Sequence, residues 1–140
     1  MGTRADFYVG RGKDAEWLGS VAFDGHPDSR LPELGATDEA GYRACVEKIL
    51  SSKDHATRPD QGWPWPWDNS KTTDFSYAWQ GEVFCCFFGH RWMTRAEALN
   101  PDRDGEDDDQ GKACVFPDMS ARKNVTFGRR SGLIIIGIPR

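Results

Sequence analysis

Two adjacent apolar segments in the middle of the chain constrain the fold most strongly. Residues 72–80 alternate between aromatic and polar or small side chains, which is typical of a half-buried strand. Gln80-Gly81 indicates a turn, and residues 82–88 (EVFCCFF) then continue with apolar side chains on both faces. Strands of that kind normally lie in the centre of a sheet that is covered on both sides. The sequence therefore predicts a β-hairpin over 72–88 whose second strand is central.

Further strands are predicted near both ends of the chain. Residues 4–9 alternate around Phe7, and residues 16–23 follow after a glycine-rich turn, so these two segments form a second hairpin. Towards the C-terminus, we expect strands over 113–116 and over the β-branched run 132–138 (GLIIIGI). The prediction is an antiparallel sheet of five or six strands.

The clearest helix is predicted to begin after Thr37, which is a favourable N-cap. Asp38 and Glu39 place negative charge in the first turn, where the helix dipole favours it. Apolar residues then recur at offsets of three and four as far as Leu50, which gives one apolar stripe for packing. One main helix packed on an antiparallel sheet predicts an α+β fold, as a single globular domain over 1–140.

Charge and hydropathy disfavour two classes of partner. The net charge of −4 argues against direct nucleic-acid binding, which normally requires a basic excess. The longest apolar runs, 83–88 and 133–138, are far shorter than the roughly 20 residues that span a bilayer. The first six residues are polar and lack the apolar run of a signal peptide. We therefore expect a cytoplasmic protein without a membrane partner.

Cysteine usage gives an expectation about the redox compartment. The chain has four cysteines, Cys45, Cys85, Cys86 and Cys114. Cys85 and Cys86 would point to opposite faces of a strand, so they cannot act together as a CxxC metal pair does. We interpret all four as reduced thiols, most of them buried, in a reducing compartment. The alternative is a zinc site that combines some of them with His26 or His90; we predict no metal or other cofactor.

The most distinctive segment is Gly62–Asp68 (GWPWPWD). Its prolines forbid a helix and disrupt strand pairing, so we expect an extended, partly polyproline-like conformation. Two interpretations remain for Trp63, Trp65 and Trp67. They form either a rigid flap that seals the core, or, together with Asp68, a binding surface of the kind that aromatic residues dominate.

An acidic run follows over residues 102–109 (DRDGEDDD). It lacks the helix–loop–helix frame and the later glutamate of a calcium-binding loop. The remaining interpretations are a solvated loop and a charged patch that faces a basic partner. In the second interpretation Asp107, Asp108 and Asp109 are binding residues.

Three polar residues at the predicted hairpin are candidates for chemistry. His90 follows a core strand, and Asp74 on the paired strand could form an acid–base couple with it, with Arg91 beside them. Cys85 or Cys86 would be the nucleophile, but no nucleophile motif accompanies them. Because His90 can equally cap the end of the strand, we assign no catalytic residue and expect binding rather than catalysis.

Several segments resemble one group of proteins. They are Ala5–Gly12 (ADFYVGRG), Ala15–Ser20 (AEWLGS), Trp63–Asp68 (WPWPWD), Thr72–Asp74 (TTD) and Phe88–His90 (FGH). Together they are similar to small uncharacterised proteins of tailed phages and prophages, over about the first two-thirds of the chain. The resemblance implies a viral accessory protein that acts in the cytoplasm of a bacterial host cell, and it implies no catalytic residues.

The leading functional hypothesis is a non-enzymatic phage protein that binds a host protein, such as an anti-CRISPR-type inhibitor of bacterial immunity. Its candidate surfaces are the tryptophan segment and the acidic run, the latter imitating nucleic-acid phosphates in a basic groove. The alternative is a nucleotide-like ligand binder or small enzyme with a tryptophan-lined pocket. A virion component, which would self-associate as a homo-oligomer, is the third hypothesis.

Overall fold

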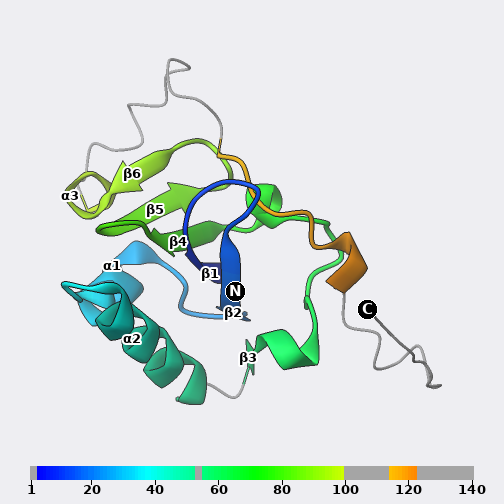
Figure 1. The fold of residues 1–140 in the computed structure, drawn as a ribbon, viewed down its shortest axis with the longest axis horizontal. Coiled ribbons are helices and arrows are strands. Elements are labelled where there is room, and N and C mark those ends of the chain that lie inside the picture. Colours follow the sequence, from blue (N-terminus) through cyan, green and yellow to red (C-terminus); the bar gives the residue numbers. More distant parts are fainter. Residues whose placement is uncertain (1–2, 53–54, 100–113, 123–140) are drawn as a thin grey trace.

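A computed structural model of the protein describes residues 3–52, 55–99 and 114–122. Within these residues the chain forms an α+β fold around one six-stranded sheet (Figure 1). Its strands lie in the order β3-β2-β1-β4-β5-β6. Their bounds are β1 (Ala5–Val9), β2 (Glu16–Val21), β3 (Ala56–Thr57), β4 (Phe75–Trp79), β5 (Val83–Phe87) and β6 (Trp92–Thr94).

The sheet is mixed, so the prediction of a wholly antiparallel sheet is wrong. Both predicted hairpins are present, as β1–β2 and β4–β5, and all their pairings are antiparallel. The two hairpins meet along β1 and β4, which run parallel from Ala5 beside Phe75 to Val9 beside Trp79. Parallel neighbours require a long crossover, and the chain between β2 and β4, which includes the main helix, provides it.

The two central strands are β1 and β4, rather than β5 as predicted. Every residue of β4 is buried. β5 lies one position from the edge, where β6 pairs with it, and its last residue, Phe87, is 42% exposed. The apolar sequence of β5 therefore reflects a strand that is covered on both faces for most of its length but exposes its C-terminal end.

The structure has more than one helix, contrary to the prediction of one main helix. Within the described residues the helical elements are α1 (Pro27–Arg30), η1 (Leu31–Leu34), α2 (Glu39–Ser51), η2 (Pro59–Gln61), η3 (Ser70–Thr72), α3 (Arg95–Ala98) and η5 (Ser120–Arg122). The predicted main helix is α2. Its N-cap is Asp38 rather than Thr37, because the Asp38 carboxylate accepts a hydrogen bond of 2.7 Å from the Gly41 amide.

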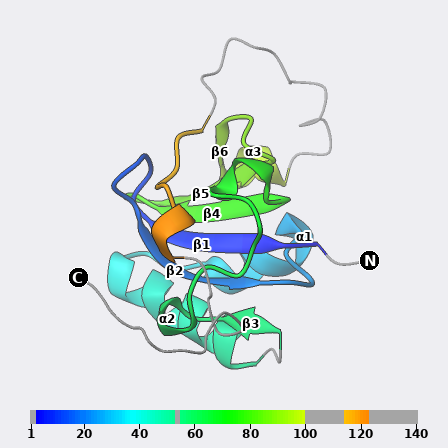
Figure 2. The same cartoon turned by 90° about the vertical axis from the view of Figure 1, so that its right-hand side faces the viewer.

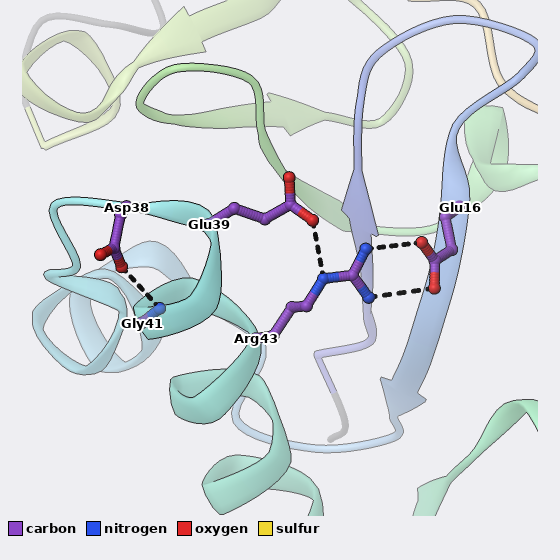
Figure 3. Close-up of polar contacts among 5 residues, drawn as sticks. All are labelled: Glu16, Asp38, Glu39, Gly41 and Arg43. Atoms are coloured by element: carbon purple, nitrogen blue, oxygen red, sulfur yellow. Dashed lines mark hydrogen bonds and ion pairs between the residues drawn. The ribbon is translucent and has the colours of Figure 1, made fainter.

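An arginine on α2 fixes the helix to the start of β2 (Figure 3). The Arg43 guanidinium donates to both carboxylate oxygens of Glu16, at 2.7 and 3.0 Å. Its Nε donates to Glu39, one turn earlier on the helix, at 2.8 Å. These hydrogen bonds hold the pKa of Glu16 below its ordinary value. Because the group is largely solvent-exposed, it sets the orientation of α2 more than it adds stability.

The two faces of the sheet are covered by different kinds of structure. Helices α1 and α2, with η1, lie on the first face and bury an apolar core against it (Figure 1). Its largest members are Phe7, Tyr77, Tyr42, Leu31 and Leu34. The second face is crossed by irregular segments, including residues 114–122 (Figure 2). They bury a second cluster, whose largest members are Tyr8, Trp17, Trp63, Phe116 and Met119.

Several predicted features fall outside the described residues. They include the strand over 132–138 and the acidic run 102–109 with Asp107, Asp108 and Asp109. Of the predicted strand over 113–116, the described residues 114–116 form no strand. No helix among the described residues has the length and apolar character needed to cross a membrane.

Candidate binding surface

The tryptophan segment packs onto the second face of the sheet. Trp63 is buried, and its ring and that of Trp17 form an edge-to-face pair with centroids 5.1 Å apart. Trp65 and Trp67 are half-buried and stack on each other at 5.7 Å. Arg4 lies over both of these rings, at 5.7 and 5.5 Å from their centroids. The segment thus covers the sheet, and of its three indole rings only parts of two reach the surface.

All three indole N–H groups of this segment are used inside the protein. Trp63 donates to the backbone oxygen of Trp67 at 2.6 Å. Trp67 donates to the Thr73 hydroxyl at 2.9 Å, and Trp65 donates to the Asp6 carboxylate at 2.7 Å. A polar group that already has a buried partner gains little from a ligand. The geometry therefore supports the sealing interpretation for this segment.

Asp6, on β1, is the centre of a buried polar network. Its carboxylate is fully buried. One oxygen accepts hydrogen bonds from Ser20 at 2.5 Å and from Trp65, and the other accepts from Ser70 at 2.6 Å. Burial raises the pKa of Asp6 above its ordinary value, although the hydrogen bonds from these three donors lower it in part.

The network continues from Ser20 to Trp17 and from Ser70 to Tyr8. The Trp17 indole donates to Ser20 at 3.0 Å. The Tyr8 and Ser70 hydroxyls lie 2.6 Å apart, and since Ser70 donates its proton to Asp6, Tyr8 donates to Ser70. All these groups are buried, so the network is closed to a substrate. It joins β1 and β2 to the segments that cover them.

Two of the four cysteines form a disulfide, Cys86–Cys114, so the prediction of four reduced thiols is wrong for this pair. Cys86 faces the second side of the sheet, and the segment from Cys114 crosses the same side, which brings together residues 28 positions apart. Cys45 and Cys85 are not part of a disulfide. Among the described residues there is no group of three or more metal ligands, and a disulfide-bonded Cys86 is not a nucleophile.

The three candidate catalytic side chains do not form an acid–base site. Asp74 accepts a hydrogen bond of 2.9 Å from the Arg4 amide and pairs with the Arg4 guanidinium at 3.5 Å. His90 stacks on the ring of Phe87, with centroids 5.8 Å apart. Arg91 pairs with a glutamate on α3 at 3.7 Å. In the part of the chain that the structure describes, no hydrogen bond or ion pair joins Asp74 to His90.

A different surface gathers exposed apolar side chains, and we call it the aromatic turn. It comprises Phe87 and Phe88 at the end of β5, whose ring centroids lie 6.3 Å apart, and His90 after them. Phe87 and Phe88 are 42% and 47% exposed, and they are two of the five large apolar residues with that degree of exposure in the part of the chain that the structure describes. Phe88 has a φ of +50°, a conformation that bulky residues rarely adopt.

Backbone contacts hold this turn in place. The amides of Phe88 and His90 donate to the Asp74 and Phe87 oxygens, each at 3.0 Å. The backbone oxygen of Gly89 accepts from the Cys114 amide at 3.1 Å. Gly89 itself has a φ of +76°, and a Cβ there would lie 2.7 Å from a backbone oxygen of Lys71. The exposed phenylalanines are therefore presented by a fixed backbone.

The remaining predicted site residues lie apart from the aromatic turn. Asp68 is exposed next to the tryptophan segment, and its backbone oxygen accepts a hydrogen bond of 2.6 Å from the Met119 amide. Sequence reasoning missed Phe87 and Phe88 because it assigned both to a buried central strand. The signal that could have identified them is the glycine that directly follows, which ends the strand with two large apolar residues at its tip.

Comparisons with known proteins found no match to this chain. No protein-family model matches it, and neither does any curated protein or solved structure.

Proposed function

We propose that this chain is a non-catalytic protein that binds a bacterial host protein through the aromatic turn. The observation that carries the proposal is the left-handed backbone of Phe88, an exposed and bulky residue. Such a conformation costs on the order of 1–3 kcal/mol and clusters at functional sites. Aromatic side chains on a rigid backbone lose little conformational entropy on binding, and they dominate the energy of protein interfaces.

The surroundings of the turn indicate what the partner presents. The backbone of Lys71 lies directly against Gly89, and the exposed Lys71 side chain forms no ion pair with any other described residue. His90 adds an exposed imidazole stacked on Phe87. The complementary surface is therefore an apolar pocket with acidic residues at its rim. The acidic run 102–109 would contact a second, basic region of the same partner.

The chemistry of the candidate catalytic residues favours binding over catalysis. The Asp74 carboxylate is paired with Arg4, and Cys86 is in a disulfide. The resemblance to small phage proteins supports a bacterial host protein as the partner, and a component of host immunity in particular. Inhibition of an immune complex by occupying one of its surfaces requires no catalytic group.

The test compares two exposed phenylalanines. Phe23 and Phe88 are similarly exposed, at 46% and 47%. Phe23, however, contacts His55 near the other edge of the sheet. We would cross-link wild-type protein, Phe88→Ala and Phe23→Ala in a bacterial host, identify the captured protein, and measure its affinity for each purified variant. We expect Phe88→Ala to weaken binding by about tenfold or more, with Phe23→Ala unchanged.

Equal affinities for the two variants would contradict the aromatic turn as the contact centre. Charge reversal of Asp107, Asp108 and Asp109 tests the second contact separately, because it should lower the affinity mainly at low salt. Size-exclusion chromatography of the free protein addresses the virion hypothesis. A homo-oligomer that Phe88→Ala dissociates would show that the turn binds another copy instead of a host protein.

A further inference from the structure

A groove of about 560 Å³ lies at the end of the β4–β5 hairpin that is opposite the aromatic turn. It is bounded by the linker that enters α2, by the β4–β5 turn and by the first residue of α3. Its apolar lining includes Leu34, Trp79 and Val83, which are at most 8% exposed, and Ala36 in the linker. The volume falls within the range of roughly 300–1,000 Å³ that is usual for small-molecule sites.

One cation in the groove is held in place by the fold. The Arg95 guanidinium donates one hydrogen bond of 2.6 Å to the backbone oxygen of Leu31, at the start of η1. It also lies against Gly35, where an added Cβ would be 3.9 Å from Nη1. Among the described residues no carboxylate pairs with Arg95. A guanidinium has five donors, so a fixed cation remains available to an acceptor in the groove.

One carboxylate lines the same groove. Glu82, in the β4–β5 turn, is exposed, and within the described ranges its side chain takes part in no hydrogen bond or ion pair. The turn itself is closed through backbone atoms, by the Gln80 amide and the Glu82 carbonyl oxygen at 2.9 Å. The carboxylate is therefore not needed to form the turn.

We infer that this groove binds an apolar zwitterion, either a free α-amino acid or a short peptide with both termini free. The ligand's carboxylate would accept from Arg95, its ammonium group would donate to Glu82, and its side chain would cover Trp79 and neighbouring apolar residues. A phosphate-bearing ligand is disfavoured by Glu82, because like charges repel. A purely apolar ligand would desolvate Arg95 without providing an acceptor.

The first experiment uses ligands that lack one charge at a time. L-phenylalanine and the dipeptide Leu-Phe represent the two sources of a zwitterion; N-acetyl-phenylalanine lacks the ammonium group and phenylalanine amide lacks the carboxylate. Calorimetric titration should detect binding of at least one zwitterion, and each blocked analogue should bind about tenfold or more weakly. The stronger of the two zwitterions identifies the source. No binding of either zwitterion at about 10 mM would overturn the inference.

Variants then assign the two charges. Glu82→Gln should remove the preference for the zwitterion over N-acetyl-phenylalanine and keep the preference over the amide. Arg95→Gln, which removes the cation, should do the reverse, and Asp14→Asn, an exposed change in the β1–β2 turn, should alter neither. If Arg95→Gln unfolds, Glu82→Gln and the ligand series still decide the question. A Glu82→Gln variant with unchanged preferences would contradict the assignment.

This inference is independent of the proposed function. Phe88→Ala should bind the zwitterion as the wild type does, because Phe88 and the groove lie at opposite ends of the β4–β5 hairpin. Failure at one surface can therefore be distinguished from failure at the other.

Discussion

The two faces of the sheet are closed in different ways. The first face is covered by α1, η1 and α2, whose apolar side chains pack on Phe7 and Tyr77. Helices satisfy most of their own backbone groups, so apolar packing is sufficient to attach them. The second face is covered by segments with little regular structure. Side-chain hydrogen bonds that converge on Asp6 attach residues 65–70, whereas a disulfide and backbone hydrogen bonds attach residues 114–122.

This difference explains why the second cluster contains buried polar side chains. An irregular segment such as the tryptophan segment has few backbone hydrogen bonds of its own, so its position must be specified by side chains. Indole N–H groups suit this purpose because each combines a large apolar surface with one donor. The expected consequence is that substitutions on the second face disrupt several segments together.

The largest expected effect is that of Trp63→Ala. Trp63 is 1% exposed and packs against Trp17, so its removal should lower the free energy of unfolding by about 3–5 kcal/mol. Urea denaturation of the variant and the wild type measures it. Trp67→Phe is the matched control: it keeps an aromatic ring at a half-buried position and should cost far less. Equal losses would mean that Trp63 is not a core residue.

Asp6→Ala tests whether the network holds the second face. The change leaves the Ser20, Ser70 and Trp65 donors without their acceptor in a buried site, so the free energy of unfolding should fall by about 2–3 kcal/mol. Ser20→Ala removes one donor only and should cost less. A stability equal to the wild type would show that burying the carboxylate costs as much as its hydrogen bonds contribute.

The pH dependence of stability tests the same residue with a known sign. Burial raises the pKa of Asp6 above the 3.8 expected in the unfolded chain. Between the two pKa values, the folded protein therefore keeps a proton that the unfolded chain has released. The resulting contribution of Asp6 to the free energy of unfolding is greatest below the unfolded pKa, and it is lost as the pH rises through the folded pKa. Asp6→Asn cannot titrate.

Denaturation of the wild type and of Asp6→Asn should be compared from about pH 4 upwards. The stability of the wild type relative to this variant should decline as the pH rises. A relative stability that increases with pH would mean that the hydrogen bonds lower the pKa of Asp6 by more than burial raises it. The comparison cancels the other carboxylates, including Glu16, whose pKa is lowered.

Arg43→Ala on the first face should have the smallest effect. Its partners Glu16 and Glu39 are exposed by about half, and exposed ion pairs contribute at most about 1 kcal/mol. The loss should shrink further in high salt. A loss comparable to that of Asp6→Ala would show that α2 depends on this ion pair rather than on its apolar face.

Local patterns in the sequence were sufficient to predict both hairpins and α2, because alternation, helical periodicity and capping all act over a few residues. They could not predict the parallel pairing of β1 with β4, which depends on contacts between residues about 70 positions apart. The same limitation concealed the Asp6 network, since Asp6 in an alternating strand resembles a solvent-facing residue.

Of the candidate site, the tryptophan segment was identified from its composition, and its sealing geometry required the positions of Asp6 and Thr73. The aromatic turn was not predicted, because Phe87 and Phe88 continue an apolar run whose end is visible only once β6 and the segment from Cys114 are in place. His90 was singled out as a possible partner of Asp74, but in the structure it stacks on Phe87.

The most direct test of the sealing role is hydrogen exchange at the tryptophan indoles, followed by NMR in the free protein. The chain has six tryptophans, and the indole N–H groups of Trp63, Trp65 and Trp67 each have an acceptor in the structure. All three indole N–H groups should exchange slowly, and Asp6→Asn should increase the exchange rate of the Trp65 indole more than that of the other two. If Trp65 and Trp67 exchange at the rate of a solvent-exposed indole in the wild type, the segment does not seal the second face and is instead available for binding.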